Sequence, residues 1–335
     1  MRIDDRPRAH ETTLPADPFA DTEVPSDEAP TLPAARFADR ARASIDYAAM
    51  VAQATAAAPP SRDRQVQQGL DDLRDRFSGP YTVNGTTVVS SPAMFRMNHP
   101  RPKEMVAAVW QAASKAGVGN PNPIIWGQGT PAQLVKVTQA LVEMGRLPPG
   151  PGDLSARIRQ MQWEHGIGVD CAGYCREALI ATATKRPPLY APGAESFRDL
   201  DHARAGSFAK QKIADIRPGD LITLDPIAPE VWGHNVVVYA HDVADASAKR
   251  TLATLHGEAM KAFLSSPGPH HVIEVDSSWG AGATGADYGG FRRDTWIYDE
   301  ATKSWGCFEP WSPRRFVTST EGPSGDRYHG AYRAR

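Results

Sequence analysis

The pattern around one cysteine constrains the fold of this chain more than any other feature. Residues 168–174 have the character of a short polar strand end that leads into a helix, with Cys171 in the first turn and Asp170 just before it. Further along, residues 233–239 put His234 at the entrance of an apolar strand. A helix that carries a nucleophile and precedes antiparallel strands predicts an α+β fold, with this helix packed on a small sheet or half-barrel.

Cys171 is the predicted nucleophile. The free N–H groups and the dipole at a helix N-terminus favour the thiolate, and the Cys171 N–H is a candidate oxyanion donor. Asp170 is expected to cap this helix, while its negative charge raises the pKa of the thiol. A histidinium at His234 would outweigh that charge, so we expect His234 to be the general base.

A third polar group is expected to orient the imidazole and fix its tautomer. The strand predicted at 271–276 supplies two carboxylates, Glu274 and Asp276, which share one face of the strand. Ile273 and Val275 share the other face. Either carboxylate is suited to accept a hydrogen bond from His234, and the sequence leaves the choice open.

The other cysteines indicate no metal site. The chain has three cysteines, too few for a disulfide framework or a four-cysteine zinc site. Cys175 follows Cys171 by one helical turn, so we expect it to pack in the core. His270 and His271 lack a matched second cluster of ligands, which favours a surface location over a metal centre. We therefore predict no metal and no cofactor, and a reducing compartment.

Composition and charge exclude several classes of partner. The formal net charge is −2, which gives no electrostatic footprint for nucleic acid. No stretch approaches the roughly 18 apolar residues of a membrane span. The first residues lack the apolar segment of a secretory signal. The protein is expected to be cytoplasmic as made, or to be exported by a route that does not depend on such a signal.

Four regions are predicted along the chain. Residues 1–30 contain eight acidic residues against three arginines and few large apolar side chains, so residues 1–38 are predicted to be a disordered acidic tail. Residues 39–150 are predicted to be mostly helical, with an unknown role. Residues 151–318 form the predicted catalytic domain, and residues 319–335 a loose C-terminal tail.

Periodicity and turn residues predict the individual elements. The pair Asn84-Gly85 between β-branched residues predicts a tight hairpin over 81–89. Helices are predicted at 39–58, 63–77, 102–116, 131–145, 154–163 and 171–183. Strands are predicted at 220–224, 234–240 and 271–276, with a hairpin that joins 295–298 to 305–308.

Three motifs resemble those of the NlpC/P60 family of papain-like cysteine peptidases. The first is the Asp-Cys-Ala-Gly-Tyr run at 170–174, the second is the Pro-Gly-Asp-Leu turn at 218–221, and the third is Gly233-His234 followed by valines and Tyr239. They occur in the family's order and cover about a third of the chain. The resemblance implies a papain-like fold, Cys171 as nucleophile, His234 as general base, and no metal.

The family resemblance also implies a reaction. The usual family reaction is hydrolysis of an amide in the stem peptide of bacterial peptidoglycan. Two positions depart from the family pattern: Ala172 replaces the usual serine, and Trp163 stands where a tyrosine is common before the cysteine. The family's third polar residue is commonly a histidine, and by strand position Glu274 stands there, with Asp276 two residues on.

We therefore expect a cysteine peptidase or amidase that acts on peptidoglycan. The missing signal and the acidic tail suit an antibacterial effector delivered by a secretion machine, with a secretion adaptor or an immunity protein as partner. A papain-like deamidase or acyltransferase that acts on a protein substrate is one alternative. A non-catalytic binding module with an inert Cys171 is the other.

Overall fold

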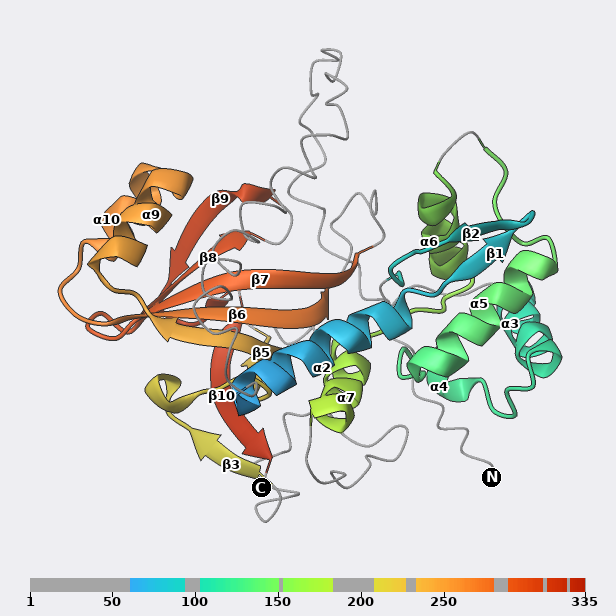
Figure 1. The fold of residues 1–335 in the computed structure, drawn as a ribbon, viewed down its shortest axis with the longest axis horizontal. Coiled ribbons are helices and arrows are strands. Elements are labelled where there is room, and N and C mark those ends of the chain that lie inside the picture. Colours follow the sequence, from blue (N-terminus) through green and yellow to red (C-terminus); the bar gives the residue numbers. More distant parts are fainter. Residues whose placement is uncertain are drawn as a thin grey trace, which may run out of the picture. The chain divides into compact units, whose positions relative to one another are not determined.

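The computed structural model describes residues 61–93, 103–150, 153–182, 208–226, 233–279, 289–309, 312–323 and 326–334. Helices dominate the first half of this part of the chain and strands the second half (Figure 1). The helices before the candidate site are α2 (Arg62–Phe77), α3 (Lys103–Lys115), α4 (Asn122–Ile125), α5 (Pro131–Glu143) and α6 (Leu154–Glu164). None of the helices among the described residues is both long and apolar enough to cross a membrane.

Local sequence signals explain these helices. Ser61 caps α2 by accepting a hydrogen bond from the Arg64 N–H, and the buried face of α2 consists of Val66, Leu70, Leu73 and Phe77 at helical spacing. At the start of α5, Thr130 and Gln133 form a capping box. Between α2 and α3, β1 (Tyr81–Val83) pairs with β2 (Thr86–Val88). The predicted helices at 63–77, 102–116, 131–145 and 154–163 and the hairpin are confirmed.

The turn between β1 and β2 has the backbone conformation that the Asn84-Gly85 pair predicts. Asn84 has φ 49° and Gly85 has φ 78°, so both residues occupy the left-handed region. A two-residue turn with positive φ at both positions matches the right-handed twist of the flanking strands, and Asn-Gly is the pair that adopts it most readily.

An eight-stranded antiparallel sheet forms the second half of the fold. Its strand order is β3-β10-β4-β5-β6-β7-β8-β9. The strands are β3 (Phe208–Gln211), β4 (Leu221–Asp225), β5 (His234–Val243), β6 (His270–Trp279), β7 (Gly290–Asp299), β8 (Ser304–Glu309), β9 (Ser312–Ser319) and β10 (Arg327–Ala334). Two helices, α9 (Ala246–His256) and α10 (Glu258–Leu264), connect β5 to β6. The predicted α+β class is confirmed.

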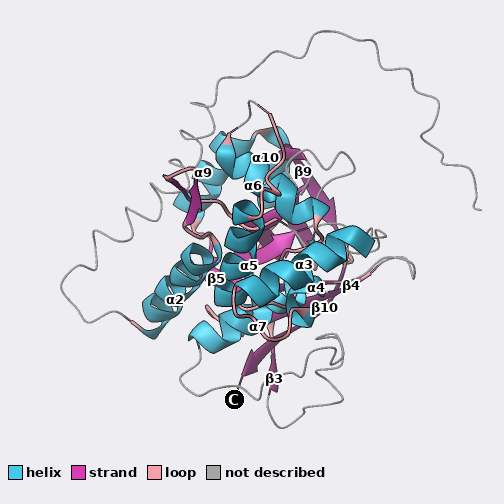
Figure 2. Cartoon of the chain, turned by 90° about the vertical axis from the view of Figure 1, so that its right-hand side faces the viewer, coloured by secondary structure: helices cyan, strands magenta, loops and turns pink. Residues whose placement is uncertain are grey.

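Both faces of this sheet are covered. On one face, Leu221 of β4 and Val237 of β5 join the core that includes α7 (Cys171–Thr182) and α2. On the other face, Ile222, Val236 and Val275 belong to a separate apolar core. We call these the helix face and the inner face. Helices and strands are distinguished by colour in Figure 2.

The inner face folds back on itself. Trp305 of β8 and Tyr328 of β10 are in ring contact, with centroids 5.0 Å apart, although β4, β5, β6 and β7 lie between their strands in the sheet. Strands so far apart in the order meet only if the sheet curls, so the inner face is the concave side of a half-barrel.

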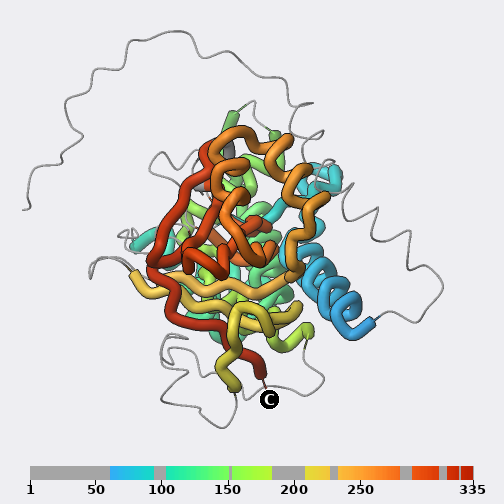
Figure 3. The backbone as a smooth tube through the Cα atoms, turned by 90° about the vertical axis from the view of Figure 1, so that its left-hand side faces the viewer, coloured from blue at the N-terminus to red at the C-terminus, as the bar shows by residue number. Residues whose placement is uncertain are grey.

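Two predictions about organisation are wrong. Residues 319–335 are not a loose tail, because β10 pairs with both β3 and β4 and runs beside them in Figure 3. Position 150 is not a domain boundary, because Pro60–Arg335 is one compact unit. The predicted acidic tail at 1–38 and the predicted helix at 39–58 lie outside the described residues.

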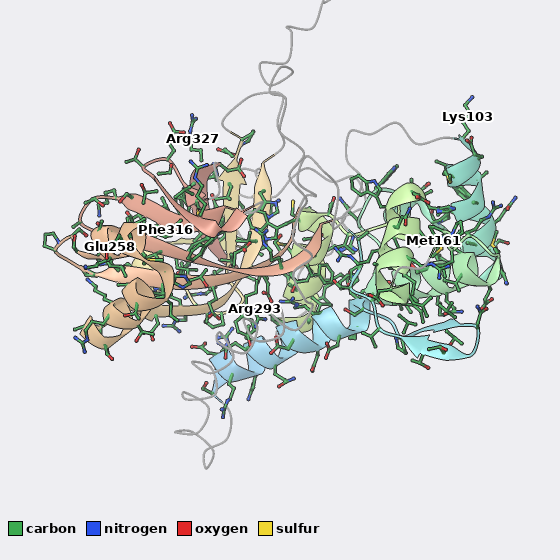
Figure 4. The ribbon with its side chains drawn as sticks, turned by 90° about the horizontal axis from the view of Figure 1, so that it is seen from above. Lys103, Met161, Glu258, Arg293, Phe316 and Arg327 are labelled. Carbon is green, nitrogen blue, oxygen red and sulfur yellow. The ribbon has the colours of Figure 1, made fainter. Side chains whose placement is uncertain are left out.

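A cluster of charges ties α2 to the sheet. Arg293 of β7 donates two hydrogen bonds to the buried Asp276, at 2.8 and 2.9 Å, and one to Asp71 of α2 at 2.9 Å. Its guanidinium lies 3.1 Å from the ring centroid of Tyr239. Arg74 of α2 adds a third donor to Asp276 at 3.3 Å. Figure 4 labels Arg293, which lies next to α2.

We predict that Arg293→Met destabilises the protein strongly. The variant keeps much of the side-chain volume but leaves the Asp276 carboxylate with one weaker basic partner inside the protein. Breaking a buried pair in this way costs about 3 kcal/mol. Urea unfolding followed by circular dichroism measures the change in the free energy of unfolding.

Lys115→Met is the matched control. Lys115 forms an ion pair with Glu143 in which both side chains are about half exposed. Exposed pairs contribute little, so this variant should unfold close to the wild type. Equal effects of the two substitutions would contradict the assignment of Arg293 as the structural partner of the buried Asp276.

Candidate active site

Backbone hydrogen bonds fix the segment before Cys171. The Val169 N–H donates to Ala93 O at 3.2 Å, and the Asp170 N–H donates to Gly127 O at 2.8 Å. The Ser278 hydroxyl of β6 donates to Val169 O. The helical region and the sheet thus both hold this segment, which determines where α7 begins.

Asp170 caps α7 as predicted. Its carboxylate accepts a hydrogen bond from the Gly173 N–H, and its backbone oxygen accepts one from the Tyr174 N–H at 3.0 Å. Burial raises the pKa of Asp170 to about 7, although the Gly173 hydrogen bond and the positive charge of Arg176 oppose that rise. Asp170 therefore changes charge near neutral pH, directly beside the thiol.

Cys171 is the accessible cysteine. It is half-buried at the N-terminus of α7, whereas Cys175 and Cys307 are buried. Cys175 belongs to the core on the helix face, as the sequence predicts. A reagent or a substrate would therefore reach Cys171 first.

Three N–H donors surround the Cys171 sulfur. The Asn235 Nδ2 lies 4.0 Å from Sγ, and the backbone N–H groups of Asn235 and Ala172 also donate to it. These donors favour negative charge on the sulfur. Burial nevertheless raises the pKa of the thiol to about 12, and the neighbouring Asp170 adds to that rise. The thiol is therefore protonated at neutral pH in this arrangement.

His234 lies on the opposite face of β5 from the thiol. Successive side chains of a strand alternate between faces, so Asn235 on the helix face puts His234 on the inner face. Its ring lies against that of Trp279, with centroids 4.0 Å apart and the ring planes tilted by 35°. The buried Nε2 of His234 has no hydrogen-bond partner in the described part of the chain. Burial lowers the pKa of His234 to about 3, and the positive charge of Arg292 also lowers it.

The predicted contact between Cys171 and His234 is therefore absent from the described geometry. The strand entrance lies where the sequence predicts it, because β5 begins at His234. The face on which His234 lies does not follow from the sequence. The residue that meets the sulfur is the next one, Asn235, and sequence reasoning missed it. Alternation along the strand was the available signal, but it leaves the orientation of the strand undetermined.

Neither predicted carboxylate orients His234. Asp276 lies on the helix face, where it accepts hydrogen bonds from Arg74, Arg293 and, at 3.5 Å, the Tyr174 hydroxyl. Asp276 is thus a structural charge, and its predicted role as the partner of the imidazole is wrong. Glu274 shares the Asp276 face, and among the described residues it makes no hydrogen bond to a histidine. Burial raises the pKa of Glu274.

Comparison of the chain with protein-family models, with curated proteins and with solved structures gives no match. The resemblance to the NlpC/P60 family therefore rests on the three motifs. Within the described ranges, no three His, Cys, Asp or Glu side chains gather in a way that would hold a metal ion.

We predict that the thiol of Cys171 reacts slowly with iodoacetamide. A thiol with a pKa of about 12 has far less thiolate at pH 8 than a free cysteine, so alkylation should be slower by more than ~100-fold. Asp170→Asn removes a neighbouring negative charge and should accelerate alkylation roughly tenfold, the effect of one pKa unit. Peptide mass spectrometry over a pH series measures both rates.

Asp153→Asn is the control for this prediction. Asp153 also precedes a helix, α6, but makes no capping hydrogen bond with its side chain. It should leave the rate at Cys171 unchanged. A wild-type rate at pH 7 close to that of free cysteine would contradict the protonated thiol.

Proposed function

We propose that this chain is a cysteine-dependent amidohydrolase that cleaves an amide in peptidoglycan stem peptides. The observation that carries the proposal is the position of Cys171. It is the accessible cysteine, it begins a helix packed on an antiparallel half-barrel, and N–H donors surround its sulfur. The order of the three motifs supports the substrate class.

The reaction follows from these groups. The Cys171 thiol loses its proton to a base, and the sulfur forms a bond to the amide carbon. The Ala172 N–H, which donates to the sulfur at the start of α7, is placed to stabilise the negative charge that moves from sulfur to oxygen. The C–N bond then breaks as the leaving amine accepts a proton, which leaves a thioester. Water hydrolyses the thioester, releasing a carboxylic acid and restoring the thiol.

Removal of the thiol proton by His234 requires a change at β5, because His234 lies on the opposite face of the strand from the sulfur. His234 is adjacent to Asn235, and both stand at the very start of the strand. A rotation of the strand entrance by one position would exchange the two side chains between faces. In the proposed active form the imidazole of His234 therefore takes the place of the Asn235 amide beside Sγ.

A second candidate function has an observation in its favour. The protonated thiol and the orientation of His234 in the described geometry both suit a non-catalytic binding module. In that case Asn235 and the N–H groups around Cys171 would bind a carbonyl group of the ligand, and no bond would be cleaved.

Digestion of purified peptidoglycan distinguishes these functions. We expect new muropeptides from the wild type, and their masses identify the cleaved bond. Cys171→Ala should abolish them, whereas Cys307→Ala, which removes a buried thiol on β8, should retain them. His234→Ala should reduce turnover by at least ~100-fold if the imidazole is the base.

Each other result has a distinct meaning. Activity that survives His234→Ala but not Asn235→Ala would contradict the exchange of faces. Binding of muropeptides without cleavage by any variant would favour the binding module. An alkylatable Cys171 with neither cleavage nor binding would overturn peptidoglycan as the substrate in favour of a protein.

A further inference from the structure

The loop that follows α4 packs directly against the start of the cysteine helix. We call residues 126–129, with the sequence Trp-Gly-Gln-Gly, the tryptophan loop. Gly127 O accepts the Asp170 N–H at 2.8 Å, and Gln128 forms a bridge with Val169. Gln128 O accepts a hydrogen bond from the Arg176 guanidinium. The loop is thus attached to α7 both before and after Cys171.

Gly173 shows how close this approach is. A Cβ on Gly173 would collide with Gly127 O and would press on Cα of Gln128, which are backbone atoms that cannot rotate away. The backbone of the tryptophan loop therefore touches the first turn of α7. Trp126 precedes Gly127, so the backbone at Trp126 is one peptide unit from the atoms that contact the helix end carrying Cys171.

Trp126 is exposed where its neighbours are buried. Ile124 is 0% and Ile125 8% exposed, which holds α4 in the core, while Trp126 is 46% exposed. Among the described residues, its indole has no ring contact. A large rigid side chain on an anchored backbone presents apolar area that loses little conformational entropy on binding.

The chain around Trp126 is uncharged. Between Lys115 and Lys136 there is no Asp, Glu, Lys, Arg or His, and the polar side chains there are mostly amides, as in Asn120, Asn122 and Gln128. The charged side chain that contacts this loop, Arg176, is already paired with Glu177 at 3.0 Å. An indole with nearby amides suits the C–H face and the hydroxyl groups of a neutral pyranose ring.

We propose that Trp126 is a substrate-binding residue that stacks on the sugar ring to which the stem peptide is attached. This inference rests on the proposed function, since it assigns a sugar-binding position to the same site. The indole face covers the ring, and the tryptophan loop holds the sugar at a fixed distance from the Cys171 sulfur.

The kinetic test compares two substrates. Trp126→Ala should raise the KM for a disaccharide-tetrapeptide roughly tenfold with little change in kcat, because stacking binds ground state and transition state alike. The KM for the sugar-free tetrapeptide should stay unchanged. Trp126→Phe should restore most of the affinity for the disaccharide-tetrapeptide.

Trp110→Ala is the matched control. Trp110 is also 46% exposed, but it lies on α3. It should leave both KM values unchanged. An equal rise of both KM values in Trp126→Ala would overturn the sugar as the ligand, and no rise in either would overturn the role of Trp126.

A binding measurement separates this inference from the proposed function. The Cys171→Ala variant is labelled with 5-fluorotryptophan, which gives one fluorine resonance for each of the eight tryptophans, and Trp126→Phe assigns one of them. We expect the Trp126 resonance to move when the disaccharide-tetrapeptide is added, while the Trp110 resonance stays. Movement without any hydrolysis by the wild type would overturn the hydrolase and keep the sugar site. A Trp126 resonance that stays still would overturn the sugar site.

Discussion

The alternation of side chains along β5 decides which group meets the thiol. The strand runs under α7, and its two faces belong to different cores: Val237 packs with the helices and Val236 with the inner face. Because adjacent side chains of a strand point to opposite faces of the sheet, His234 and Asn235 cannot both face Cys171 in one register. The chemistry of the site therefore depends on which of two adjacent residues faces the helix.

Much of the fold could be predicted from local signals. Ser61, the Asn84-Gly85 pair and the regular spacing of Leu70, Leu73 and Phe77 specify their elements without reference to distant residues. The strand β10 could not be predicted in this way. Its residues Arg327–Ala334 contain no β-branched side chain, and the strand is stabilised by pairing with β3 and β4, about a hundred residues earlier. Only the assembled sheet makes this segment a strand.

The candidate site likewise combines features that local sequence determines with features that depend on distant parts of the chain. Asp170 as cap, Cys171 in the first helical turn and Cys175 in the core all follow from the spacing within one helix. The face of His234 and the partners of Asp276 depend on the packing of several elements, which a single sequence does not reveal. The tryptophan loop belongs to residues 39–150, whose role the sequence left unknown. The local signal for its contact with α7 is Gly173, a glycine inside a helix at the point where another backbone comes close.

The Arg293 cluster has a consequence for the evolution of this chain. Asp276, Arg293, Asp71 and Arg74 come from β6, β7 and α2, and each charge is balanced by the others. Asp276 is the buried member, so loss of its basic partners leaves a negative charge inside the protein, and we expect replacement of these residues to occur jointly more readily than singly. Related chains should therefore keep these four residues together or lose them together, which offers a way to recognise distant relatives that have diverged around the cysteine.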